Sequence, residues 1–142
     1  MALGAGCAQQ GEAPARATPA PAAPVGEAAR YNGWYQGHGV PVSPGVNCRD
    51  RTHSIWFRVE DGLVEMRSSR HRRSAVTPAL LTGTLSPDGQ VALRGTSFEG
   101  LAAGQIAGGR VTVEDASPVV MRDGRPSCRY RYEAEFRERL RN

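Results

Sequence analysis

The segment Cys128–Phe136 has the most restrictive pattern in the chain, because two kinds of side chain alternate along it without a break. Successive side chains of a β-strand point to opposite faces of the sheet, so the segment is predicted to be a strand with one buried and one wet face. The predicted buried face carries Cys128, Tyr130, Tyr132, Ala134 and Phe136, and the wet face carries Arg129, Arg131, Glu133, Glu135 and Arg137.

The clearest predicted hairpin joins residues 53–60 to residues 63–67 through Asp61-Gly62. Asp-Gly between two β-rich runs indicates a type I′ turn, because both central residues of that turn need positive φ. The resulting register places Val59 opposite Val64 and Phe57 opposite Met66 on the core side, and Arg58 opposite Glu65 on the outer side. The last pair is expected to be a favourable cross-strand charge pair.

Two further hairpins are predicted, 79–85 with 90–95 through Ser86–Gly89 and 101–107 with 110–114 through Gly108-Gly109. Their expected core residues are Leu81, Leu85, Val91, Leu93, Ile106 and Val111. Together with a first strand near residues 31–37, the sequence predicts an all-β fold of about eight antiparallel strands and no convincing helix. We expect an up-and-down barrel, with a β-sandwich as the alternative.

Cys48 and Cys128 belong to the first and last parts of this predicted sheet, and we expect them to form one disulfide. The bond would close a loop of about 80 residues and stabilise the domain by on the order of 4 kcal/mol in the chain-entropy model. The alternative is a pair of buried thiols.

The start of the chain is unlike the rest. Small residues lead into Cys7, as before the acylated cysteine of a bacterial lipoprotein, although the charged and long apolar regions of such a signal are missing. The Ala- and Pro-rich run that follows lacks aromatic residues and predicts a semi-extended linker. We therefore expect a signal remnant and linker over 1–29 and a barrel domain over 30–142, anchored through Cys7 to the membrane; the alternative is a disordered start with a chance cysteine.

Composition argues against several classes of function. All 18 basic residues are Arg, and the net charge is only +4, with most Arg alternating with Glu or Asp, so nucleic-acid binding is not expected. The three histidines lack metal-ligand spacing, and no nucleophile-elbow sequence appears. We expect no enzyme, no metal and no cofactor, and a monomer.

Two groups of residues are candidate binding sites. A basic loop gathers guanidinium groups, which recognise carboxylates and phosphates through paired hydrogen bonds; its members are Arg67, Arg70, His71, Arg72 and Arg73. A set of aromatic residues is expected to line a barrel mouth or form a contact patch; it comprises Tyr31, Trp34, Tyr35 and Trp56. The alternatives are a solvated basic loop, and aromatic packing against the linker or a neighbouring loop.

Short patterns along residues 31–137 resemble those of small secreted or lipid-anchored bacterial β-barrel domains. They are the Gly- and Tyr-rich first strand (residues 32–37), the Gly-x-Leu-x-x-Asp-Gly hairpin (83–89), the Gly-x-Ile-x-Gly-Gly turn (104–109) and the terminal Cys-x-Tyr-x-Tyr strand. Looser similarities are to lipocalins, through Gly33-Trp34, and to periplasmic protease-inhibitor barrels. The resemblance implies a barrel and carries over no functional residues.

These expectations favour a binding module in the periplasm or outer membrane of a Gram-negative bacterium, either lipid-anchored or secreted. Its expected partner is an anionic envelope component or a protein. The alternatives are a small-molecule carrier with a lipocalin-like cavity and a periplasmic protease inhibitor.

Overall fold

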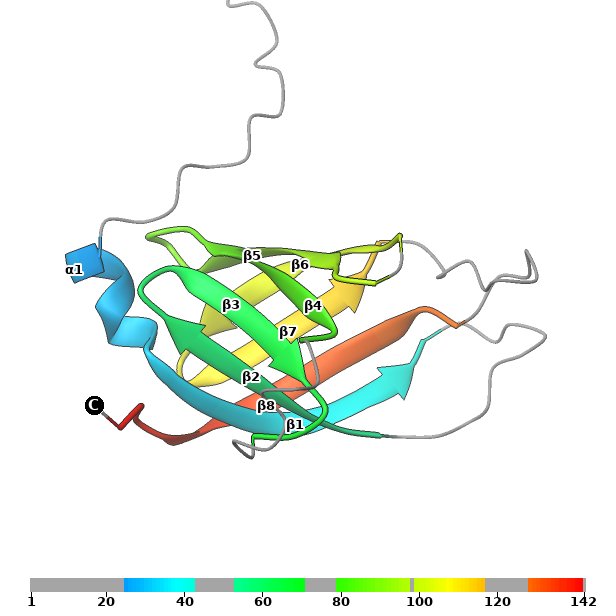
Figure 1. The fold of residues 1–142 in the computed structure, drawn as a ribbon, viewed down its shortest axis with the longest axis horizontal. Coiled ribbons are helices and arrows are strands. Elements are labelled where there is room, and N and C mark those ends of the chain that lie inside the picture. The colour runs from blue at the N-terminus through cyan, green and yellow to red at the C-terminus, as the bar shows by residue number, and fades with distance from the viewer. Residues whose placement is uncertain (1–24, 43–52, 71–78, 98, 117–127, 142) are drawn as a thin grey trace, which may run out of the picture.

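The computed structural model describes residues 25–42, 53–70, 79–97, 99–116 and 128–141. Eight antiparallel strands form a closed barrel in which each strand pairs with its neighbours in sequence and β8 returns to pair with β1 (Figure 1). The strands are β1 (Gly33–Pro41), β2 (His53–Glu60), β3 (Leu63–Arg67), β4 (Leu81–Leu85), β5 (Gln90–Gly95), β6 (Leu101–Ala107), β7 (Arg110–Asp115) and β8 (Tyr130–Glu138). The predicted up-and-down barrel is confirmed, and the alternative of a β-sandwich is wrong because the sheet closes on itself.

The β2–β3 hairpin has the predicted turn and register. Asp61 and Gly62 both have positive φ, at 49° and 82°, and Val59 lies opposite Val64. Arg58 also lies opposite Glu65, but the expected ion pair between them is absent from the described side chains. Each charge instead pairs along its own strand, Arg58 with Glu60 and Glu65 with Arg67. Along-strand partners two residues apart share the same wet face, so they compete with the cross-strand partner.

Inward-facing apolar side chains fill the barrel. The described residues contribute one continuous buried cluster, which includes all the predicted hairpin core residues. Its members are Tyr35, Ile55, Phe57, Val59, Val64, Met66, Leu81, Leu85, Val91, Leu93, Ala102, Ile106, Val111, Val113, Tyr132 and Ala134. Burial of this apolar surface is the main favourable contribution to folding.

Gly37, an inward position at the centre of β1, lets β1 and β8 approach closely. A Cβ atom at Gly37 would lie 1.7 Å from the carbonyl oxygen of Glu133 on β8. Gly83 in β4 and Gly104 in β6 have the same relation to their partner strands, with distances of 1.8 Å and 1.9 Å. Small barrels need sharp local curvature, and glycine supplies it where a side chain would block the partner strand.

The predicted buried face of β8 is correct for Tyr132 and Ala134 but not for Phe136, whose exposed fraction is 42%. Phe136 keeps its register with Tyr35 of β1, but the pairing of β8 with β7 ends at Glu135, so Phe136 lies at the end of the barrel. Its ring still contacts that of Tyr35 edge to face, with centroids 5.5 Å apart. The alternation predicted the face of the strand, and the extent of the pairing with β7 decided where burial ends.

A short helical segment precedes β1, where the sequence predicted the end of the linker. It consists of α1 (Val25–Ala28) and η1 (Ala29–Tyr31), and Ala28 is fully buried. The Arg30 guanidinium donates to the Pro87 carbonyl in the β4–β5 turn, and the Tyr35 hydroxyl donates to the Tyr31 carbonyl at 2.8 Å. The ordered domain therefore starts earlier than composition indicates, because tertiary contacts hold a segment too short to be a helix alone.

A backbone hydrogen bond joins the end of β1, which leads toward Cys48, to the residue that precedes β8. The Val42 N–H donates to the Arg129 carbonyl at 2.8 Å, and the adjacent Cys128 is buried. Cys48 lies outside the described residues, so the cross-link stays a prediction.

Gly37→Ala should destabilise the domain by about 2–3 kcal/mol, because the new methyl group must push β8 away from β1. Gly26→Ala is the matched control, since a Cβ there meets nothing within 4 Å. Urea unfolding followed by tryptophan fluorescence measures both changes. Equal midpoints for the two variants would contradict the close-approach explanation.

Candidate functional site

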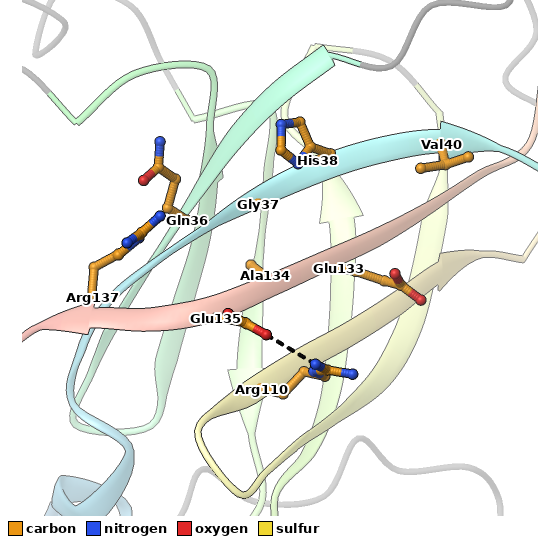
Figure 2. A pocket seen from close by; sticks show the side chains of 9 residues that line it. All are labelled: Gln36, Gly37, His38, Val40, Arg110, Glu133, Ala134, Glu135 and Arg137. Carbon is orange, nitrogen blue, oxygen red and sulfur yellow. Dashed lines mark hydrogen bonds and ion pairs between the residues drawn. The ribbon is translucent and has the colours of Figure 1, made fainter.

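The outer surface of β1, β2, β7 and β8 contains two adjoining open hollows, of about 430 and 550 Å³. The first is lined by Gln36, Gly37, His38, Val40, Arg110, Glu133, Ala134, Glu135 and Arg137 (Figure 2). The second is lined by Gln36, Trp56, Arg70, Arg137 and Glu138. Because Gln36 and Arg137 belong to both, we treat the two hollows as one surface feature, the outer groove.

The alternation of β1 explains why polar and aromatic side chains line the outer groove. Glycines and Tyr35 occupy the buried positions of this strand, so Trp34, Gln36 and His38 point outward. The β1–β2 register then places Gln36 directly opposite Trp56. The outer groove is therefore built on paired strands, which position side chains more rigidly than loops do.

Aromatic and basic residues predicted as separate sites meet beside the outer groove. The Trp34 and Trp56 rings pack edge to face, with centroids 6.3 Å apart, and both residues are partly exposed. The Arg70 guanidinium lies 5.3 Å from the centre of the Trp56 ring, which is within cation–π distance. Arg70 also forms an ion pair with Glu138.

Arg137 is the cation at the junction of the two hollows. Its side chain extends toward Gln36 in Figure 2, and none of the described residues forms an ion pair or hydrogen bond with it. Glu135 and Glu133 instead pair with Arg110 at 2.9 Å and Arg131 at 3.2 Å. Arg137 therefore keeps its full donor capacity for a ligand.

The remaining predicted residues lie elsewhere. Tyr35 is only 3% exposed, so its predicted place in a contact patch is wrong; burial raises its pKa to about 12. Tyr31 lies at the barrel end under Arg30, with the guanidinium carbon 4.7 Å from the ring centre. Arg67 pairs with Glu65 on β3. Cys7, Cys48, His71, Arg72 and Arg73 lie outside the described residues.

Gln36, Arg137 and Glu138 were not singled out from the sequence. The alternation of β8 did place Arg137 on the wet face, but a wet-face arginine in a charge-rich strand does not stand out. The missing information was the register between β1 and β8, which brings chain positions about a hundred residues apart together.

A second polar cluster lies near the other end of the barrel, around the buried carboxyl group of Asp115. The Tyr130 N–H donates to Asp115 Oδ2 at 2.9 Å. Burial raises the pKa of Asp115, and hydrogen bonds from the Tyr130 N–H and the Tyr132 hydroxyl offset part of that rise. The His53 ring packs edge to face on Tyr130, with centroids 5.1 Å apart. This cluster satisfies polar groups where β7 ends and β8 begins. None of its residues lines either hollow of the outer groove.

Neither a metal centre nor a membrane-spanning helix is found in the part of the chain that the structure describes. No three His, Cys, Asp or Glu side chains there gather closely enough to hold a metal ion. No described helix has the length and apolar character to cross a bilayer.

Comparison with known proteins identifies no relative: no family model, curated protein or solved structure matches this chain.

Asp115→Asn should alter the pH dependence of stability. Because the folded-state pKa of Asp115 lies above its ordinary value of 3.8, the folded chain binds this proton more tightly than the unfolded chain. The stability that it contributes is full below that value and is lost as pH rises through the folded pKa. The variant lacks this loss, so its free energy of unfolding relative to the natural chain should increase from pH 3.5 to pH 7. Parallel stability curves from urea titrations would contradict this.

Proposed function

We propose that this protein is a binding module that captures an anionic partner in the outer groove and catalyses no reaction. The observation that carries the proposal is Arg137, a cation without an ion-pair partner among the described residues, at the junction of two hollows. Guanidinium groups bind carboxylate and phosphate through two parallel charge-assisted hydrogen bonds. Because Arg137 extends from a β-strand over a hollow, it is better placed to bind an anion than an arginine surrounded only by solvent.

Arg70 supplies a second cation next to Arg137. The Trp56 ring supports its guanidinium group, which reduces the side-chain freedom that a ligand would otherwise have to restrict. Its present partner, Glu138, lines the same hollow. A carboxylate ligand that binds Arg70 would therefore displace the Glu138 carboxylate. Glu138 thus competes with the ligand for Arg70.

The outer surface offers more room for a ligand than the barrel interior does. The inward side chains form one continuous buried cluster, whereas the two hollows of the outer groove are open to solvent. A carrier would need an interior volume that these side chains occupy.

The proposed setting is the bacterial cell envelope, with Cys7 as the lipid attachment site and Cys48–Cys128 as a disulfide. The hydrogen bond from Val42 to Arg129 supports the disulfide, because it holds the strand next to Cys128 against the strand that leads toward Cys48. An oxidising compartment is where such a bond persists.

Arg137→Ala should weaken binding to a carboxymethyl-dextran surface by about tenfold, the loss expected for one charge-assisted interaction. Surface plasmon resonance at fixed ionic strength measures the change. Arg94→Ala is the matched control, since Arg94 is exposed on β5 and its loss changes the net charge equally.

Glu138→Gln provides a control of opposite sign, because it releases Arg70 and should strengthen binding. If Arg137→Ala and Arg94→Ala have equal effects, general charge attraction explains retention and the outer groove does not.

Non-reducing peptide mapping should find Cys48 joined to Cys128. Reduction should then lower the free energy of unfolding by on the order of 4 kcal/mol. Alkylation of both Cys48 and Cys128 in the unfolded, unreduced protein would refute the cross-link and remove the main support for an oxidising compartment.

A further inference from the structure

The charges of the outer groove are separated along its length. Arg137 lies at one end beside Gln36, and Glu133 lies toward the other end, with the Glu135–Arg110 ion pair between them (Figure 2). The side chain of Glu133 is 52% exposed, and its ion pair with Arg131 uses only one oxygen, Oε1. A carboxylate has about four acceptor positions, so Glu133 can accept further hydrogen bonds.

This separation selects against a uniformly anionic partner. A charged membrane surface or a polymer with a charge at every step would bring negative charge toward Glu133. Like charges at 4 Å repel by about 4 kcal/mol near a protein surface. The fitting ligand is anionic at the Arg137 end and carries neutral hydrogen-bond donors at the Glu133 end.

The residues between these ends suit hydroxyl groups. The Gln36 amide and the His38 imidazole can each donate and accept, and neither side chain forms a hydrogen bond within the described ranges. His38 lies directly opposite Glu133 across the β1–β8 pair. A ring with several hydroxyl groups, each both donor and acceptor, would match this row.

The tryptophan pair adds an apolar surface at the cationic end. Trp56 lines the groove beside Arg70, and Trp34 buttresses it edge to face. Large partly exposed aromatic rings supply contact area to ligands that also carry polar groups. A sugar is a ligand of this kind, because the apolar C–H face of its ring packs against an aromatic ring.

We propose, building on the proposed function, that the ligand of the outer groove is an acidic sugar: a hydroxylated ring with one carboxylate or phosphate group. The anionic group binds Arg137, with Arg70 beside it. The hydroxyl groups bind Gln36, His38 and Glu133, and the apolar ring face contacts Trp56.

Four probes test this by NMR titration at equal ionic strength: glucuronate, glucose 6-phosphate, glucose and succinate. At least one acidic sugar should bind more tightly than both glucose, which lacks the anion, and succinate, which lacks the hydroxyl groups. Tighter binding of glucuronate identifies the preferred anionic group as a carboxylate, and tighter binding of glucose 6-phosphate identifies it as a phosphate. Shifted amide signals should cluster on β1, β2 and β8.

Glu133→Gln should affect the affinity for acidic sugars and the affinity for succinate differently. The substitution removes a charged hydroxyl acceptor, so it should weaken acidic-sugar binding by about three- to tenfold. It also removes a negative charge, so succinate binding should stay the same or strengthen. Glu99→Gln, at an exposed site outside the groove, controls for net charge, and thermal unfolding verifies that each variant folds.

The possible failures are distinguishable. If Arg137→Ala leaves every probe unchanged, the proposed function itself fails. If Arg137→Ala weakens binding but Glu133→Gln strengthens acidic sugars and succinate alike, anion capture stands and the sugar proposal is overturned. Absence of binding by both acidic sugars overturns it too.

Discussion

The pairing of β1 with β8 is the contact on which the rest of this structure depends. It closes the sheet, so that no strand edge is left to pair with another chain. It also brings the first and last strands into a register in which Gly37 lies opposite Ala134. The close approach at Gly37 shows the physical requirement, since even a methyl group would meet the backbone of β8.

The same pairing creates the candidate site. Gln36 comes from the first strand and Arg137 from the last, and only closure of the barrel puts them on one surface. The interior is filled with apolar side chains, so chemistry is left to the outer face. There, the described residues form six ion pairs, three within one strand and three between separate segments, and Arg137 takes part in none of them.

Local rules predicted the hairpins well because turn chemistry and alternation act over a few residues. Asp61-Gly62 determined its own turn, and the register of β2 with β3 followed from it. Phe136 and Arg58 show where these rules end. The first lies beyond the last residue of β8 that pairs with β7, and for the second a neighbour two residues away formed the ion pair expected across the strands.

The sequence alone determined an eight-stranded antiparallel fold, the face on which most core residues lie, and the presence of outward aromatic and basic residues. Tertiary structure decided that the sheet closes, that Tyr35 lies in the core, and that Trp56, Arg70 and Arg137 line one groove. The physical reason is the distance along the chain over which each effect acts. Side-chain periodicity and turn preference are encoded within short segments, whereas the β1–β8 register results from how eight strands together fill one interior.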